Sequence, residues 1–184
     1  FGMGRIGLAA ARRAAGFDMN IAFYDPHQPD GYELATGYKR FSSAEELFET
    51  ADTISIHSPL TDETRGAINA NLLGRMHDRA VVINTARGPI VDLDAMYDAL
   101  KAGKPAGAGL DVLPQEPADS NHPLIQAYMA REEWLEGRLM VSPHAAFYSP
   151  PGLLDLRTKA AQTAAQRIRD GSVRNCQNLA FLTD

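Results

Sequence analysis

Hydrophobic and polar positions alternate along this 184-residue chain with two different periods. Short runs of apolar and β-branched residues predict strands at residues 21–24, 53–57, 80–83, 107–112 and 139–141. Apolar residues three or four positions apart predict helices at residues 8–15, from 42 or 43 onward, and at 69–76, 92–100, 123–135 and 150–171. Strands that alternate with helices form parallel β-α-β units. The pattern therefore predicts an α/β fold with a doubly wound parallel sheet.

Capping residues indicate where several of these helices begin and end. Ser42 or Ser43 can accept a hydrogen bond from the first turn of one helix, and Asp92 can cap another. Gly171 follows the last predicted helix, where glycine commonly ends a helix. The run at residues 80–83 contains no polar side chain, so we expect this strand to be buried on both faces of the sheet.

Composition and charge exclude several classes of protein. The net charge is −5, and Lys and Arg are scattered, so we expect neither a nucleic-acid partner nor an anionic membrane surface. The single cysteine, Cys176, excludes an internal disulfide and fits a reducing compartment. No apolar run approaches the roughly 18 residues that a membrane-spanning helix needs. We expect a cytoplasmic protein without a metal site.

A glycine-rich turn, Gly2-x-Gly4-x-x-Gly7, leads directly into the first predicted helix. Glycines at this spacing allow a tight turn, the close approach of a pyrophosphate, and packing of a helix against its strand. The helix that follows offers unpaired N–H groups and a partial positive charge to phosphates. Phe1 occupies the place of the last residue of a preceding strand. The turn predicts a dinucleotide-binding site, although glycine-rich turns of this kind also occur without a ligand.

Asp25 follows the predicted strand at residues 21–24, where dinucleotide-binding folds place an acidic residue that binds the adenosine ribose. A carboxylate at this point accepts hydrogen bonds from the ribose diol and repels a 2′-phosphate. Pro26 and His27, rather than an arginine, come next. Asp25-Pro26 could also be an ordinary turn that closes a strand. With the glycine turn, Asp25 predicts NAD in preference to NADP.

Three polar residues follow predicted strands at the edge of the sheet where such folds bind their ligands: Arg87, Glu116 and His144. Each alone also fits an ordinary surface or loop residue. Together they suit the chemistry of a keto acid, because a guanidinium can hold a carboxylate through two hydrogen bonds. Imidazole can transfer a proton near neutral pH, and a neighbouring carboxylate can orient its ring.

Four motifs in order resemble those of the D-isomer-specific 2-hydroxyacid dehydrogenases; they lie at residues 2–7, 84–88, 111–117 and 142–146. Within this family, the chain is most similar to the C-terminal binding protein branch, through residues 23–26, 30–31, 144–149 and 175–178. The similarity covers essentially the whole chain. It implies a Rossmann-like NAD-binding domain and an oxidoreductase that uses NAD.

The resemblance also implies residue roles. His144 would be the acid/base, Glu116 its partner, and Arg87 the anchor for the substrate carboxylate and carbonyl. Asp111 would hydrogen bond the nicotinamide carboxamide. Cofactor contacts are implied at Gly2, Gly4, Arg5, Ile6, Gly7, Asp25, Ser58, Thr64, Thr85, Ala86, Arg87, Asp111 and His144. In the reduction, a hydride would pass to the keto carbon while His144 protonates the oxygen, giving a D-2-hydroxy acid.

The resemblance further implies a division of the chain. Residues 1–149 would form the NAD-binding domain with the catalytic residues, and residues 150–184 a helix and tail returning toward a substrate domain. That substrate domain is built mostly from residues before the glycine turn and is largely absent from this chain. In this family the dimer forms through the cofactor domain, so we expect a homodimer.

Two departures from the family pattern bear on specificity. Phe147 stands where eukaryotic corepressors of the C-terminal binding protein branch carry Trp, and the segment at residues 117–138 is longer than in many members. We expect the helix in that segment to pack rather than to line the cleft. An NAD(H)-sensing dimeric scaffold with little turnover is the alternative to an enzyme, because such scaffolds retain the same catalytic residues.

Overall fold

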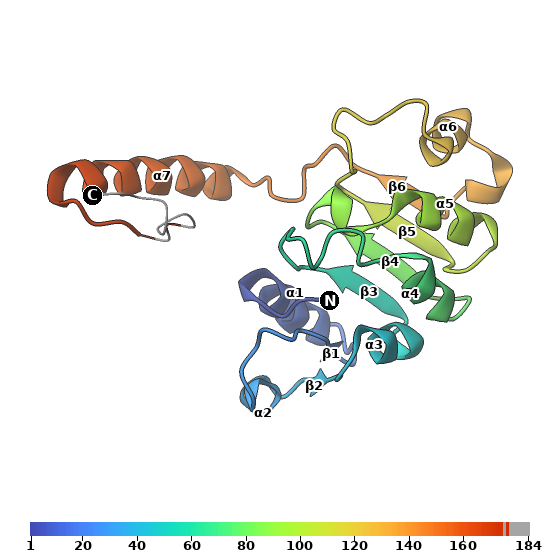
Figure 1. The fold of residues 1–184 in the computed structure, drawn as a ribbon, viewed down its shortest axis with the longest axis horizontal. Coiled ribbons are helices and arrows are strands. Elements are labelled where there is room, and N and C mark those ends of the chain that lie inside the picture. Colours follow the sequence, from blue (N-terminus) through green and yellow to red (C-terminus); the bar gives the residue numbers. More distant parts are fainter. Residues whose placement is uncertain (175, 177–184) are drawn as a thin grey trace. The chain divides into compact units, whose positions relative to one another are not determined.

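The computed structural model describes residues 1–174 and 176, which contain a parallel β-sheet flanked by helices (Figure 1). Strands β3 (Thr53–Ile56), β4 (Val81–Asn84), β5 (Gly107–Leu110) and β6 (Leu139–Val141) pair in that order, and every pair is parallel. Strands β1 (Ala22–Phe23) and β2 (Lys39–Arg40) form a second parallel pair. The predicted α/β class with a parallel sheet is confirmed.

The first two residues connect these two groups of strands. The amide of Gly2 donates to the carbonyl of Tyr24 at 2.9 Å, beyond the end of β1. On the other side, the amino group of Phe1 donates to Ser55 in β3 at 2.9 Å, and the amide of His57 donates to Phe1 at 2.8 Å. Phe1 and Gly2 therefore take the place of a strand between β1 and β3, and the glycine turn follows at its carboxyl end.

Helices α3 (Ala44–Thr50), α4 (Ala70–Arg75), α5 (Leu93–Lys101) and α6 (Pro123–Ala130) contact one another in succession beside the sheet (Figure 1). The main core lies between them and the strands and contains fully buried side chains such as Phe48, Ile54, Val82, Met96 and Leu124. Helix α1 (Arg5–Ala15) packs separately, through Ala11 and the strand residue Phe23. The side chains of Ser43, Asn69 and Asp92 cap α3, α4 and α5, as expected for Ser43 and Asp92.

Three expectations about these elements need correction. The pattern missed α2 (Tyr32–Thr36) and β2, because both are too short to show a period. The helix predicted at residues 123–135 is two elements: α6 stops at Ala130, the left-handed backbone of Arg131 (φ 54°) ends it, and a 3-10 turn covers Glu133–Leu135. In β4, Val82 and Asn84 are buried but Val81 and Ile83 are only half-buried, because the core lies on one face.

The chain divides into two compact units, Phe1–His144 and Ala145–Asp184. The second unit contains helix α7 (Pro150–Asp170), which Ser149 caps at its start and Gly171 follows with φ 74°. No residue of α7 is buried. Within the part of the chain that the structure describes, no helix has the length and apolarity to cross a membrane. Cys176 is described, whereas residues 175, 177 and 178 of the fourth branch motif lie outside the described residues.

Candidate active site

The three glycines of the turn have different neighbours. A Cβ on Gly2, whose φ is 88°, would lie 2.7 Å from the amide nitrogen of Ser58, and one on Gly7 would lie 2.2 Å from the carbonyl oxygen of Gly2. Both contacts are with backbone that cannot rotate away. A Cβ on Gly4 would meet nothing within 4 Å. Gly2 and Gly7 are therefore required by the fold itself, while Gly4 leaves open space beside the backbone that a ligand can approach.

The start of helix α1 has the properties of a phosphate site. Gly4 is its N-cap residue, and no side chain caps it. The first helical bond inside it runs from Leu8 to Gly4, at 2.9 Å. The next residues, Arg5 and Ile6, are exposed, Ile6 to 70%. The amides of the first turn of a helix have no partner within the helix, so this uncapped turn fits a pyrophosphate.

Asp25 is buried beside this turn, only 8% exposed. Its Oδ2 accepts hydrogen bonds from the amide of Met3 at 2.7 Å and from Gln28 Nε2 at 3.3 Å. Its Oδ1 accepts from the amide of His27 at 3.0 Å. Each carboxylate oxygen has two lone pairs, so Asp25 can still accept from a ribose hydroxyl. Met3 and Gln28 are contacts that the sequence pattern did not identify, because both depend on the fold of the turn.

Ser58 and Thr64 follow β3 on the other side of Gly2. Ser58 is buried, and among the described residues its hydroxyl oxygen has no hydrogen-bond partner. Buried hydroxyls are normally paired, so a missing partner here fits a site that a ligand completes. The Thr64 hydroxyl instead donates to the carbonyl of Pro59 at 2.6 Å and accepts from the amide of Thr61 at 2.8 Å. It shapes the loop after β3.

The structure brings together His144 and Glu116, the two residues to which the family resemblance assigns the acid–base chemistry. His144 Nδ1 lies 2.7 Å from Glu116 Oε2, although the two residues are 28 positions apart, and each side chain is 41% exposed. The other carboxylate oxygen of Glu116 accepts from the amide of Leu113 at 3.0 Å. The hydrogen bond to His144 lowers the pKa of Glu116, so this carboxylate is charged at neutral pH. A carboxylate that accepts from Nδ1 leaves Nε2 as the nitrogen that exchanges a proton with a substrate.

The backbone holds His144 in an uncommon conformation next to Asp111. Its φ is 51°, in the left-handed region, and its amide donates to the carbonyl of Asp111 at 2.8 Å. Asp111 is buried, 5% exposed, and one of its carboxylate oxygens accepts from the Ser142 hydroxyl at 2.6 Å. Ser142 was part of a recognised motif, but its role as a partner of Asp111 required the structure. Together these contacts connect the ends of β5 and β6.

Arg87 stands on a loop that a buried asparagine shapes. Asn84 is fully buried at the end of β4; its amide group donates to the carbonyl of Arg87 at 3.0 Å, and its oxygen accepts from the amide of Ala86 at 3.0 Å. The guanidinium of Arg87 is exposed and donates to the carbonyl of Ala86 at 2.6 Å. Thr85, in the same loop, is also exposed.

This loop touches the loop that carries Glu116. A Cβ on Gly88 would lie 1.9 Å from the backbone carbon of Leu113, so the two backbones are in direct contact. The structure thus brings Glu116 and His144 into a hydrogen bond and places Arg87 on an adjoining loop. All three follow the carboxyl ends of neighbouring strands, where open α/β sheets bind their ligands.

A pocket of about 410 Å³ adjoins the catalytic pair. Glu116, His144, Asp111 and Tyr128 are among the residues that line it. Tyr128 comes from α6, the helix that the sequence led us to expect only to pack. The helix does pack, through Leu124 and other buried residues, but its Tyr128 side chain is 38% exposed and borders this pocket.

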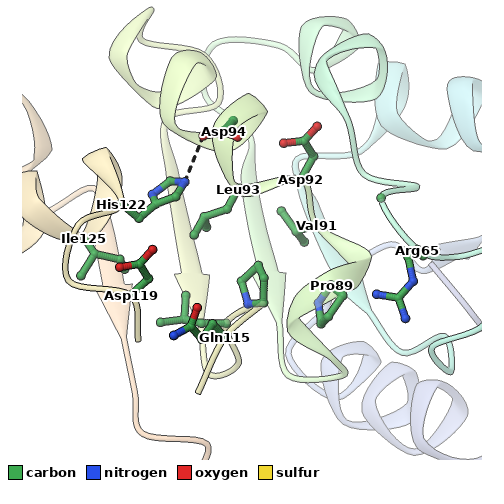
Figure 2. Close-up of a pocket in the computed structure, with 13 residues that line it drawn as sticks. Arg65, Pro89, Val91, Asp92, Leu93, Asp94, Gln115, Asp119, His122 and Ile125 are labelled. Carbon is green, nitrogen blue, oxygen red and sulfur yellow. Dashed lines mark hydrogen bonds and ion pairs between the residues drawn. The ribbon is translucent and has the colours of Figure 1, made fainter. Parts of the chain in front are cut away.

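A second pocket lies behind the same loops (Figure 2). Pro89 and Val91 border it after β4, and Gln115 borders it on the loop of Glu116. In Figure 2, His122 points toward Asp94, with Nε2 and Oδ1 3.1 Å apart. The other ring nitrogen of His122 caps α6 by accepting from the amide of Leu124. This His–Asp pair therefore serves the start of α6.

Comparison with known proteins identifies the class. Residues 1–146 match the model of the NAD-binding domain of D-isomer specific 2-hydroxyacid dehydrogenases. The chain belongs to this family and carries its NAD-binding domain, as the sequence motifs and the fit of the glycine turn and Asp25 indicate. The similarity to the C-terminal binding protein branch stays a prediction.

Individual relatives extend this comparison. The chain is 41% identical to a glyoxylate reductase of Korarchaeum cryptofilum over 91% of the chain and 46% of the relative. The structure is also similar to a D-lactate dehydrogenase of Aquifex aeolicus, solved with NAD and lactic acid, with a TM-score of 0.74 and 30% sequence identity. This match covers 91% of the present chain and 52% of the Aquifex aeolicus chain. A further similar structure is an NADPH-dependent glyoxylate/hydroxypyruvate reductase of Sinorhizobium meliloti, solved with NADP and malonate, with a TM-score of 0.79 and 30% sequence identity. This match covers 94% of the present chain and 50% of the Sinorhizobium meliloti chain. The chain thus spans about half the length of these relatives.

Proposed function

We propose that this protein is an NAD-dependent oxidoreductase that interconverts a 2-keto acid and a D-2-hydroxy acid. The observation that carries the proposal is the hydrogen bond of 2.7 Å between His144 Nδ1 and Glu116 Oε2 at the strand ends of an NAD-binding domain. A charged carboxylate on Nδ1 fixes the ring and its tautomer, so Nε2 can donate a proton to a keto oxygen or accept one from a hydroxyl.

The other residues supply binding and orientation. Arg87 presents an exposed guanidinium, which suits the carboxylate of a small acid through two parallel hydrogen bonds. The uncapped start of α1, Asp25 and Ser58 would hold the dinucleotide, and Asp111 would orient its nicotinamide end. Bound NADH supplies the hydride. Glyoxylate is the first substrate to test, because relatives named glyoxylate reductase share this domain.

The experiment measures NADH oxidation by the whole protein with glyoxylate, hydroxypyruvate, pyruvate and longer 2-keto acids. In His144→Ala, turnover should fall by about a hundredfold to ten-thousandfold, because proton transfer by a positioned side chain contributes that much. NADH binding, followed by fluorescence, should persist. His77→Ala is the matched control: His77 also faces a carboxylate, with Nε2 3.1 Å from Asp52, but it lies before β4, at the opposite ends of the strands.

Turnover in His144→Ala equal to that of the wild type would refute the acid/base assignment. Tight NADH binding by the wild type without turnover of any acid would favour the NAD(H)-sensing scaffold instead. The homodimer expected from the family is part of this proposal, and the mass of the protein in solution with and without NADH tests it.

A further inference from the structure

Two loops, one after β1 and one after β3, meet through the side chains of His27 and Glu63. His27 Nε2 lies 3.0 Å from Glu63 Oε2, although the residues are 36 positions apart. His27 follows Asp25 on the loop after β1, and Glu63 stands in the turn after β3. The two side chains are 74% and 60% exposed. An exposed pair of this kind contributes little stability by itself, so its position depends on how the two loops are held.

The rest of the structure fixes both loops. On one side, Arg40 of β2 donates to the carbonyls of Asp25 at 3.0 Å, Gln28 at 2.9 Å and Pro29 at 3.2 Å. On the other side, the Thr64 hydroxyl bonds the backbone within the turn after β3. The guanidinium of Arg40 is occupied by these carbonyls, so His27 is the one basic residue of residues 25–31 that borders the other loop.

The pair also spans the expected position of the cofactor. Phe1 and Gly2 lie between β1 and β3, so the loops of His27 and Glu63 flank the glycine turn on its two sides (Figure 1). In doubly wound sheets the ligand occupies the crevice at this point, where the strand order reverses. Asp25, beside His27, marks the adenosine ribose end of that crevice.

We propose that His27 and Glu63 form a clasp across the adenosine end of the site, in which Glu63 acts as a second carboxylate that selects NAD over NADP. The inference rests on the dinucleotide site proposed above. A 2′-phosphate carries about two negative charges and would be repelled by Asp25. The ring nitrogen Nε2 of His27 could otherwise hydrogen bond that phosphate, and Glu63 prevents this by occupying Nε2 and by adding its own negative charge.

The test uses two substitutions that break the same contact but change the charge in opposite senses. Fluorescence titrations give the dissociation constants of NADH and NADPH for the whole protein. In Glu63→Gln, NADPH should gain about twofold to fivefold in affinity relative to NADH, the range expected for one exposed charge pair. In His27→Gln, NADPH should lose relative affinity, because the carboxylate of Glu63 is left without the imidazole as its hydrogen-bond partner. The NADH constants should change less than twofold in both variants.

Glu49→Gln is the matched control, because Glu49 pairs with Arg75 between α3 and α4 and does not border the crevice. The proposal would be overturned if the ratio of the NADPH and NADH dissociation constants shifted in the same direction in both variants, or shifted in neither. The pair would then be a structural contact only. A wild-type protein that binds neither nucleotide would instead refute the dinucleotide site itself, so the two failures are distinguishable.

Discussion

The proposed adenosine end and the proposed acid–base end of the site are held in opposite ways. Asp25 is 8% exposed and accepts hydrogen bonds from three N–H groups, beside glycines whose backbones leave no room for a side chain. Glu116 and His144 are each 41% exposed and stand on loops. The proposed nucleotide contact is therefore part of the folded core, whereas the proposed chemistry would rest on side chains that the fold only exposes at a surface. Substitutions at the first end should mainly change stability, and those at the second should mainly change reactivity.

After His144→Ala, the largest effect at the exposed end should come from Arg87→Gln. Loss of two charge-assisted hydrogen bonds to a substrate carboxylate should lower kcat/KM for a 2-keto acid by about a hundredfold to a thousandfold. The melting temperature should stay within about 1–2 °C, because the side chain is exposed. Arg65→Gln is the control, since Arg65 is also exposed and borders the second pocket. An equal loss in both variants would show a general charge effect.

The glycine turn offers a test inside the buried end. Gly7→Ala should destabilise the protein by about 1–3 kcal/mol and abolish NADH binding, because its Cβ would lie 2.2 Å from the Gly2 carbonyl. Gly4→Ala should destabilise the protein far less, because nothing lies within 4 Å of its Cβ, but should weaken NADH binding. Urea denaturation measures the change in stability, and a parallel nucleotide titration measures the change in NADH affinity. NADH affinity unchanged in Gly4→Ala would contradict a pyrophosphate at this turn.

Acid should destabilise the buried end through His57, which lies beside Gly7. Burial lowers the pKa of His57 to about 4, from an ordinary value of 6.5. Between these values the unfolded chain binds more protons than the folded chain, so the free energy of unfolding should fall as the pH falls from 6.5 to about 4. In His57→Gln this part of the decline should disappear. Denaturation curves of the wild type and of His57→Gln at pH 7, 5.5 and 4.5 measure the free energy of unfolding. If it declined equally in the two proteins, His57 would not be the cause.

The smallest effect should come from Glu116, at the exposed end. The hydrogen bond to His144 lowers the pKa of Glu116 below its ordinary value of 4.5, so the charged form stabilises the fold at neutral pH. This contribution should be lost as the pH falls below 4.5 and Glu116 takes up a proton. Wild type and Glu116→Gln should therefore differ slightly at pH 7 and converge in acid. A difference that grows in acid would contradict the sign of this shift.

Much of the fold could be predicted from the sequence because its signals are local. The glycine spacing, the apolar strand runs and the caps Ser43 and Asp92 are each contained within a few residues, and the structure confirms them. Short elements escaped prediction: α2 and β2 have too few residues to show a period. Nor could the sequence show that α6 ends at Ala130 or that Val81 is half-buried, since both depend on neighbouring elements.

For the site, the residue types and their order can be read from the sequence: the glycine turn, Asp25, Arg87, Glu116 and His144. How these residues are held depends on the folded chain, because their partners come from distant positions. Asn84 shapes the loop of Arg87, Ser142 bonds Asp111 from 31 positions away, and Glu63 reaches His27 across the glycine turn. Packing of parallel strands brings their loops to one edge of the sheet, and no local pattern records which side chains then meet.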